Sequence, residues 1–401
     1  MEAFNPFEKY PNWSSSCIWL NQKYTNTHVD FFCGAGGLSI GFERAGFETV
    51  LATDWNQNAI ETFNYNRQNI NPAGKVSDIK ELLLNTDSFG EIDVVTGGPP
   101  CQSFSTANRQ RIIDDPRNNL YKEFVRCCNK IRPKAVVMEN VIGIRKVSDQ
   151  IIQDFKNIGY IGNLHFINAK DFGLPQNRRR AFFVFFKKEI YPDCEDRLFN
   201  FEINIEGRKN ISKEFKLRDA LDGLRPLTPN NQKNNTKIEN EQSGYTYDTP
   251  YCDGNIDYLR IINGESDLAR RYIFNHKARY NNTRDIEIFS RLPQGCDSLH
   301  KSIADIMPYK NRNNMFKDKY YKLKDDEVCK TICAHMKLDC NMYIHPNQAR
   351  GLTPREAARI QGFPDNYIFR GTLGEWYQQI GNAVPPILAY HIASSLKQSI
   401  K

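Results

Sequence analysis

The chain has 401 residues, of which 40% are hydrophobic and 25% charged, and its formal net charge is +7. This balance is that of a folded protein with one large or two smaller domains, and it excludes a disordered or fibrous chain. No apolar run approaches the roughly 20 residues of a membrane span and the first residues lack a signal-peptide core, so we expect a cytoplasmic protein.

The eleven cysteines are an odd number without Cys-x-x-Cys pairs, which favours free thiols in a reducing compartment. A zinc site at Cys329, Cys333, His335 and Cys340 is an alternative, but this spacing fits no standard ligand pattern. We therefore expect no metal. The net positive charge permits a polyanionic partner without requiring one.

The first 26 residues are interpreted as an N-terminal extension. From there to about residue 187, short β-branched or aromatic runs alternate with helical segments, which is typical of a parallel sheet with helical crossovers. This pattern predicts a doubly wound, Rossmann-like α/β domain over residues 27–187. The predicted strands are 28–32, 49–53, 92–96, 135–138 and 181–186.

A glycine-rich turn, residues 30–37, follows the first predicted strand and precedes a helix running towards Ala45. Glycines there let the backbone approach a ligand, although tight turns also use glycine for geometry alone. The turn lacks the spacing of a dinucleotide-binding loop, so a nucleoside without phosphates is the better candidate.

Acidic residues follow the next two predicted strands. Asp54 lies 20 residues beyond Gly34, where its carboxylate can hold ribose hydroxyls, and Trp55 beside it can face an adenine ring. The alternative is that Asp54 only caps a helix. Asp78 and Ile79 form a further acid-plus-apolar pair suited to the exocyclic amine and the face of the base.

The segment 97–102, with sequence GGPPCQ, follows the buried strand predicted at 92–96. Two prolines stiffen the turn before Cys101, which would hold its thiol exposed and fixed in direction, as a nucleophile requires. The alternative is an inert buried cysteine.

The α/β alternation stops near residue 188, which predicts a second domain over residues 188–345 with a long solvated loop from Pro229 to Pro250. Residues 346–401 are expected to return to the first domain. Thr353 precedes a proline and lies three residues before Glu356, which predicts a capped helix ending by Gly362. A last helix carries an apolar stripe at Leu388, Ile392 and Leu396 that must dock, most simply on the first domain.

Six blocks now stand in order along the chain: 30–37, 99–102, 139–141, 176–180, 355–364 and 379–384. Together they strongly resemble the cytosine-C5 DNA methyltransferases of bacterial restriction-modification or Dcm-like type. The resemblance covers roughly 30–190 and 343–395, and it implies the donor S-adenosylmethionine (AdoMet), with S-adenosylhomocysteine as product.

The resemblance implies four catalytic residues. Cys101 would add to C6 of cytosine and so make C5 electron-rich. Glu139 would contact N3 and the 4-amino group, Arg180 would hold O2, and Arg178 would support the thiol and nearby backbone. The alternatives are a surface glutamate and a solvated basic triplet that includes Arg179.

The resemblance also implies a cofactor site that the C-terminal segment closes. Its expected members are Phe32, Gly34, Gly36, Gly37, Asp54, Trp55, Asp78, Ile79, Pro100, Leu120, Asn382 and Val384.

Double-stranded DNA is the implied partner, and the target base must rotate out of the duplex. The polar stretch 102–118 is interpreted as a lid over DNA, or otherwise as an ordinary surface loop. Residues 188–345 would then read the DNA sequence. The expected DNA-contacting residues are Gln102, Ser105, Arg109, Arg111, Lys277, Arg279 and Thr331.

Two other functions stay open at this point: a tRNA cytosine-C5 methyltransferase of the same fold, and a catalytically silent AdoMet-fold protein that binds DNA or regulates a methylase. The tRNA branch carries a Cys-Phe-Thr signature that this chain lacks, and intact catalytic residues oppose a silent protein. We expect a monomer that protects host DNA beside a separately encoded restriction endonuclease.

Overall fold

The computed structural model describes residues 24–67, 74–82, 90–100, 120–230, 239–248, 254–264, 273–308 and 319–401. The chain divides into two compact units. We call them the sheet unit, whose described residues run up to Gly173 and continue in Arg178–Lys213 and Ala383–Lys401, and the inserted unit, with Leu174–Asn177 and Glu214–Asn382. These borders differ from those predicted at 188 and 346.

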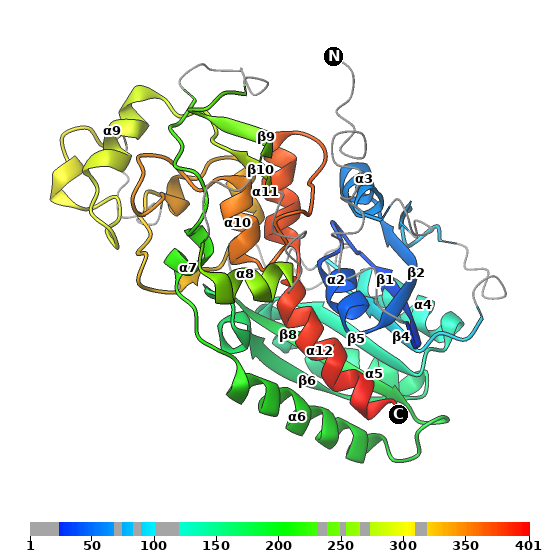
Figure 1. Cartoon of the computed structure of the whole chain (residues 1–401). Helices are drawn as coiled ribbons and strands as arrows, with labels where there is room; N and C mark the ends of the chain where they lie inside the picture. Colours follow the sequence, from blue (N-terminus) through cyan, green and yellow to red (C-terminus); the bar gives the residue numbers. More distant parts are fainter. Residues whose placement is uncertain are drawn as a thin grey trace. The chain divides into compact units, whose positions relative to one another are not determined.

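A seven-stranded sheet forms the centre of the sheet unit, in the order β3-β2-β1-β4-β5-β8-β6 (Figure 1). Its strands are β1 (Asn26–Phe31), β2 (Phe47–Asp54), β3 (Gly74–Val76), β4 (Val94–Gly97), β5 (Ala135–Asn140), β6 (Tyr160–Asn168) and β8 (Arg179–Lys187).

All five predicted strands are present, and β1 to β5 pair in parallel. The predicted doubly wound α/β fold is confirmed, with one departure from parallel pairing: β8 runs antiparallel to both β5 and β6. Because only the short segment between Asn168 and Arg179 joins β6 to β8, there is no room for the dozen or more residues of a parallel crossover.

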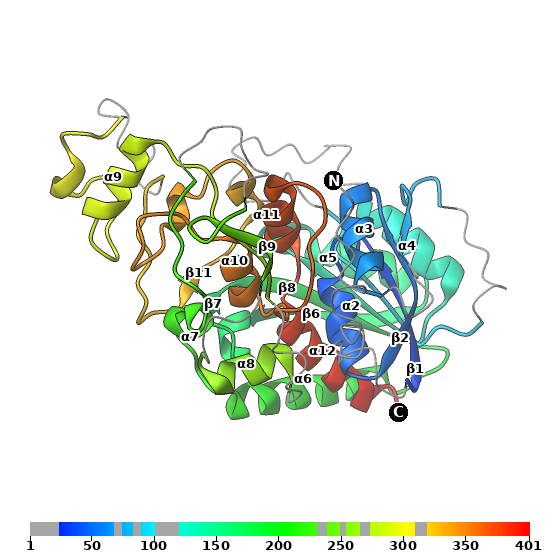
Figure 2. The ribbon, with the colours of Figure 1, turned by 45° about the horizontal axis from the view of Figure 1, so that its top comes forward.

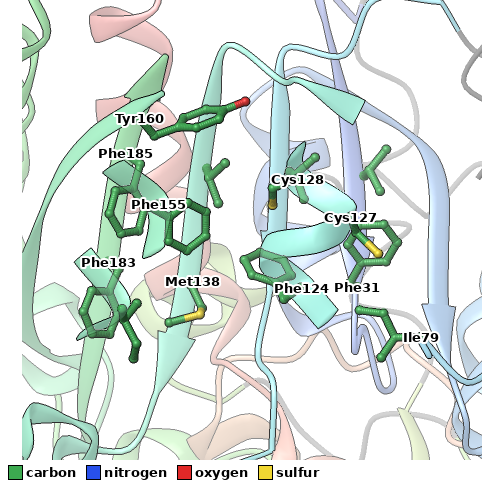
Figure 3. Packing of buried hydrophobic residues seen from close by; sticks show 14 of the residues in the cluster. Phe31, Ile79, Phe124, Cys127, Cys128, Met138, Phe155, Tyr160, Phe183 and Phe185 are labelled. Carbon is green, nitrogen blue, oxygen red and sulfur yellow. The ribbon is translucent and has the colours of Figure 1, made fainter. Parts of the chain in front are cut away.

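One face of the sheet is covered by α4 (Leu120–Ile131) and α5 (Ser148–Asn157). Figure 3 shows aromatic side chains of both helices, Phe124 and Phe155, packed against Phe31, Phe183 and Phe185 of the strands. The Phe155 and Phe185 rings stack with centroids 4.0 Å apart. This apolar layer fixes the strand ends from which the candidate site residues project.

The opposite face carries α2 (Gly37–Arg44), α6 (Cys194–Ile211) and α12 (Pro386–Ser399), and α12 lies beside α2 in both views (Figures 1 and 2). Helix α3 (Gln57–Tyr65) follows β2. Helix α6 packs on β6 and β8, which explains why the sheet unit extends past residue 188.

Helix α12 docks on the first domain, as its sequence pattern predicts. Leu388, Ile392 and Leu396 are fully buried. A Cβ atom on Gly41 of α2 would lie 2.4 Å from Cβ of Ala389, so glycine is needed there for the two helices to touch. Lys397 donates from Nζ to the carbonyl of Ala45 at 2.8 Å and so caps the end of α2.

The inserted unit is built from short elements. They are β7 (Gln176–Asn177), α7 (Leu217–Leu221), β9 (Gly244–Asp248), α8 (Ile256–Asn263), β10 (Ile273–Lys277), α9 (Thr283–Arg291), β11 (Cys329–Lys330), α10 (Pro354–Ile360) and α11 (Leu373–Asn382). Strands β9 and β10 pair antiparallel, and β7 pairs with β11 in parallel. The loop predicted over 229–250 is therefore wrong at β9.

Helix α10 begins as predicted, with a capping box in which Thr353 accepts the Glu356 amide and Glu356 accepts the Thr353 amide at 2.8 Å. Arg350 pairs with the same glutamate at 2.6 Å, and both side chains are 1% exposed. Because contacts within the inserted unit bury α10 completely, residues 346–382 belong to that unit and the return to the sheet begins only at Ala383.

Candidate active site

The glycine-rich turn after β1 has a left-handed backbone at Gly34, with φ 53°, and at Gly36, with φ 82°. A Cβ atom on Gly36 would lie 2.8 Å from the Phe63 ring, and one on Gly37 only 2.2 Å from the carbonyl oxygen of Val384. A Cβ on Gly34 would meet no atom within 4 Å. The predicted cofactor contact therefore fits Gly34, whereas packing accounts for glycine at 36 and 37.

A buried polar network supports this turn and was missed at the sequence level. Thr96 donates from its hydroxyl to Asp30 Oδ1 at 2.8 Å, and Ser39 donates to Asp30 Oδ2 at 2.6 Å. The His28 ring lies 2.9 Å from the Thr96 hydroxyl. Burial raises the pKa of Asp30 to about 6 and lowers the pKa of His28 to about 3. The network joins β1, β4 and α2 beneath the turn. In the sequence, only the presence of polar residues inside a buried strand indicated such a network.

Asp54 ends β2 and reaches back to the same turn. Its Oδ2 accepts the Gly34 amide at 2.9 Å and its Oδ1 accepts the Asn56 amide at 2.8 Å. Burial raises its pKa above the ordinary value. The helix-capping alternative is wrong, because Asn56 caps α3 by accepting the Ala59 amide.

The other predicted cofactor residues differ in exposure. Trp55 is 74% exposed, so its ring is available for stacking. Asp78 is exposed, whereas Ile79 is 4% exposed and belongs to the apolar core (Figure 3). Leu120, at the start of α4, packs partly against the same core.

The remaining members divide between the units. Phe32 is half-buried with a positive φ of 58°, and Pro100 is exposed. Val384 is 6% exposed and belongs to the sheet unit, whereas Asn382 is exposed and ends α11 of the inserted unit.

Glu139 lies near the end of β5, with Oε1 3.2 Å from Nε of Arg180. A Cβ atom on Gly98 would lie 3.2 Å from Glu139 Oε2, so the carboxyl rests against the segment that leads into Cys101. Burial raises the pKa of Glu139, although Arg180 and, to a lesser degree, Arg178 oppose the shift. Such a carboxyl can hold a proton at a pH where an exposed glutamate is ionised.

Asn140, the last residue of β5, fixes the same segment. Its Nδ2 donates to the carbonyl of Pro99 at 3.0 Å, and its Oδ1 accepts the Val141 amide at 2.9 Å. The prolines before Cys101 are thus held against the strand that carries Glu139. Cys101 itself lies outside the described residues, as do Gln102, Ser105, Arg109, Arg111 and the rest of the predicted lid.

Several other cysteines are unsuited to nucleophilic attack. Cys33, Cys128 and Cys329 are buried, and burial raises the pKa of each thiol. At neutral pH these three groups are protonated and enclosed.

Arg178 is 2% exposed, and its Nη2 donates to the carbonyl of Ala383 at 2.9 Å. This contact supports the C-terminal segment; the predicted support of the Cys101 thiol stays a prediction, because Cys101 lies outside the described residues. Arg180 is held beside Glu139, with a second hydrogen bond from Nη1 to the carbonyl of Arg179 at 2.8 Å.

Two predicted DNA contacts in the inserted unit do not fit the structure. Lys277 is 4% exposed with its Nζ 3.4 Å from Glu239 Oε1, and Arg279 donates to the carbonyls of Met336 and Leu338 at 2.9 Å each. Lys277 is the last residue of β10 and is buried there. Arg279, two residues later, holds the neighbouring loop that contains Met336 and Leu338. Thr331 is half-buried and donates to the carbonyl of Asn177 at 2.7 Å.

Comparison with known protein families identifies the family of this chain. The family model described as C-5 cytosine-specific DNA methylase matches residues 26–398. The chain belongs to this family. It is a DNA cytosine-5 methyltransferase, and the DNA methylase family it belongs to uses AdoMet as its methyl donor.

Related methylases extend over nearly the whole chain. The Type II methyltransferase M.DdeI of Desulfomicrobium norvegicum is 33% identical over 397 residues, covering 92% of this chain and 88% of that one. M1.HphI of Haemophilus parahaemolyticus is 31% identical over 92% of this chain and 86% of its own. A crystal structure described as a prophage-encoded DNA modification methyltransferase of E. coli is 26% identical, with a TM-score of 0.71 over 93% of this chain and 99% of that one.

Two further findings concern only the part of the chain that the structure describes. No helix there is both long and apolar enough to cross a membrane. No three histidine, cysteine or acidic side chains gather there as metal ligands, the Cys329 to Cys340 region included.

Proposed function

We propose that this methylase modifies one cytosine within a specific duplex sequence through a covalent adduct on Cys101. The observation that carries the proposal is the placement of Glu139, which Gly98 and Asn140 hold against the segment leading into that cysteine. β4, which precedes this segment, and β5, which carries Glu139, are adjacent parallel strands, so in the proposal the Cys101 thiol and the Glu139 carboxyl act on the same pyrimidine ring.

In this mechanism Cys101 adds to C6, and the electron pair of the 5,6 double bond moves towards C5. Glu139, whose carboxyl is biased towards its protonated form, donates a hydrogen bond to N3 as negative charge develops on the ring. Arg180 donates to O2 and shares that charge. After C5 carries the methyl group, a water molecule takes the C5 proton, the electron pair of the C5–H bond re-forms the 5,6 double bond, and the C6–S bond breaks to release the Cys101 thiolate.

The turn and strand ends fit the donor. Gly34 leaves open space beside a left-handed turn, Trp55 offers an exposed aromatic face, and Asp54 is a half-buried acceptor next to both. Bound there, AdoMet supplies an electrophilic methyl group. In the proposal Phe32, Asp78, Pro100, Leu120 and Val384 complete the site, and Ile79 supports it from the core.

Replacing Asp54 with alanine is expected to weaken cofactor binding by about 10-fold or more, since the variant loses both a ribose acceptor and the brace on the Gly34 amide. Equilibrium dialysis with labelled AdoMet measures the change. Asp149, an exposed first-turn aspartate of α5, provides the control; its alanine variant should bind like the wild type. Unchanged affinity in Asp54→Ala would remove this residue from the site.

Affinity for duplex DNA is expected to fall steeply with salt, because lysine and arginine contacts to phosphates release bound counterions. For about six phosphate contacts the loss between 50 and 200 mM salt is on the order of 10³-fold. Fluorescence anisotropy with a labelled cognate duplex measures it. A salt-independent dissociation constant would contradict backbone docking.

The biological role we propose is protection of host DNA, by a monomer acting beside a separately encoded restriction endonuclease. The Type II methyltransferases among its relatives support this role. Expression in a host without DNA methylation, followed by methylation-sensitive sequencing, tests the activity and reads its target together. Incubation with tRNA in parallel tests the alternative substrate; methylated tRNA with unmethylated DNA would overturn the proposal.

A further inference from the structure

The chain changes unit immediately before the arginine pair. Leu174–Asn177 belong to the inserted unit, and the sheet unit resumes at Arg178. A second change follows α11, between Asn382 and Ala383. Within the sheet unit, Arg178 donates to the carbonyl of Ala383 at 2.9 Å, so the two segments are joined directly after both changes.

A corresponding junction exists within the inserted unit, and Gln176 makes it. Its Nε2 donates to Gln361 Oε1 at 2.8 Å, and Gln361 in turn donates from Nε2 to the carbonyl of Ile380 at 2.6 Å. Both glutamines are fully buried. The relay Gln176–Gln361–Ile380 therefore joins the same two segments directly before both changes of unit.

Gln176 has a second contact, towards the β11 side. Its Oε1 accepts the Ile332 amide at 2.7 Å, and β7 pairs with β11 through Gln176 and Cys329. Thr331, the proposed DNA contact that precedes Ile332, donates to the carbonyl of Asn177. One side chain thus fixes the segment next to a proposed DNA contact and the segment that leads, two residues later, into Arg178.

We propose that Gln176 is a positioning residue for methyl transfer: through Gln361 it fixes the course of the chain entering Arg178 and Arg180, and so the geometry in which Arg180 meets the target base. The inference rests on the proposed role of Arg180. A planar amide at this position satisfies one buried acceptor and one buried donor at once, which neither an apolar nor a charged side chain does.

The test compares single-turnover methyl transfer with binding. Gln176→Ala is expected to lower the single-turnover rate about 10- to 100-fold, the loss that follows a small misplacement of reacting groups. Its dissociation constants for cognate DNA and AdoMet should stay within about 3-fold, because no binding group is removed. Gln378→Ala is the matched control, since this glutamine of α11 accepts a hydrogen bond from Lys337 Nζ at the surface and its loss should leave the rate unchanged.

Gln176→Glu serves where the alanine variant does not fold. It keeps the shape and the acceptor for the Ile332 amide but, when ionised, has no donor for Gln361, so the same rate loss is expected. Gln361→Ala completes a double-mutant cycle. Because the two glutamines act as one relay, the double variant should be no slower than the slower single variant.

The results that would overturn the role of Gln176 differ from the one that would overturn the proposed function. A folded Gln176 variant with the wild-type rate, or effects of the two glutamines that multiply, would overturn the inference. Loss of DNA affinity equal to the loss of rate would also overturn it, as it would make Gln176 a structural support for binding. Arg180→Ala is run in parallel: if it keeps the wild-type rate, the proposed function fails at that residue, whatever Gln176 does.

Discussion

Replacing Cys101 with alanine is expected to abolish methyl transfer, with a loss of at least about 10⁴-fold in single-turnover rate. Without a thiolate to add at C6, C5 of cytosine is too weak a nucleophile, and removal of a covalent nucleophile has effects of this order in other enzymes. Incorporation of labelled methyl groups into a cognate duplex measures the rate. The variant should still bind AdoMet, since the cofactor contacts lie on other residues.

Cys296→Ala is the control for cysteine loss, because Cys296 is a free, half-buried thiol of the inserted unit with no assigned role in the reaction. It should retain full activity. A duplex with fluorine at C5 of the target cytosine separates the steps further, since C5 then has no proton to lose. The wild type should remain attached to it through a denaturant-stable bond, and Cys101→Ala should not. Activity in Cys101→Ala would refute the covalent mechanism.

Replacing Glu139 with glutamine is expected to lower the single-turnover rate by roughly 10²- to 10⁴-fold, the usual contribution of a positioned acid. Glutamine keeps the size of the side chain and an acceptor for Arg180, but it cannot transfer a proton to the ring. Because burial raises the pKa of Glu139, its carboxyl keeps a proton to a higher pH than an exposed glutamate does. The wild-type rate should therefore fall as pH rises through this pKa, and the variant should lack that dependence.

Stability separates this chemical effect from misfolding. A carboxyl whose folded-state pKa lies above its unfolded value binds more protons when folded, so its contribution to the free energy of unfolding is present at low pH and is lost as pH rises through the folded-state pKa. Glu139→Gln removes this dependence and should unfold, at pH 8, at the same urea concentration as the wild type or a higher one. A clear loss of stability there, or an unaltered pH profile, would contradict the assignment.

The sequence predicted the sheet more reliably than its connections. Strand positions follow from short β-branched and aromatic runs, and the docking of α12 followed from one apolar stripe. The reversal of β8 did not, because a run such as residues 181–186 is buried on both sides in either orientation. Only the length of the connection from β6 reveals its direction, and β6 was not recognised.

Within the site, the sequence predicted which residues lie there better than it predicted what each residue contacts. Glu139 and Arg180 lie together as expected. Glu139 directly follows the strand predicted at 135–138, and Arg180 directly precedes the strand predicted at 181–186. At Gly36 and Gly37 the structure adds a reason for glycine that a sequence does not reveal, since a Cβ there would meet the Phe63 ring and the Val384 carbonyl. Lys277 and Arg279 were misread, since charge alone does not reveal whether a cation meets phosphate or a buried partner.

The packing of α12 on α2 also constrains how the protein is made. Lys397 bonds to Ala45 across 352 residues of chain, and Gly37 packs against the carbonyl of Val384. During translation the glycine-rich turn emerges long before the segment that packs against it. A chain that stops short of Ala383 lacks this partner, so a prematurely terminated product should not accumulate as an active methylase. Methylation competence thus requires that residues 383–399 have been made.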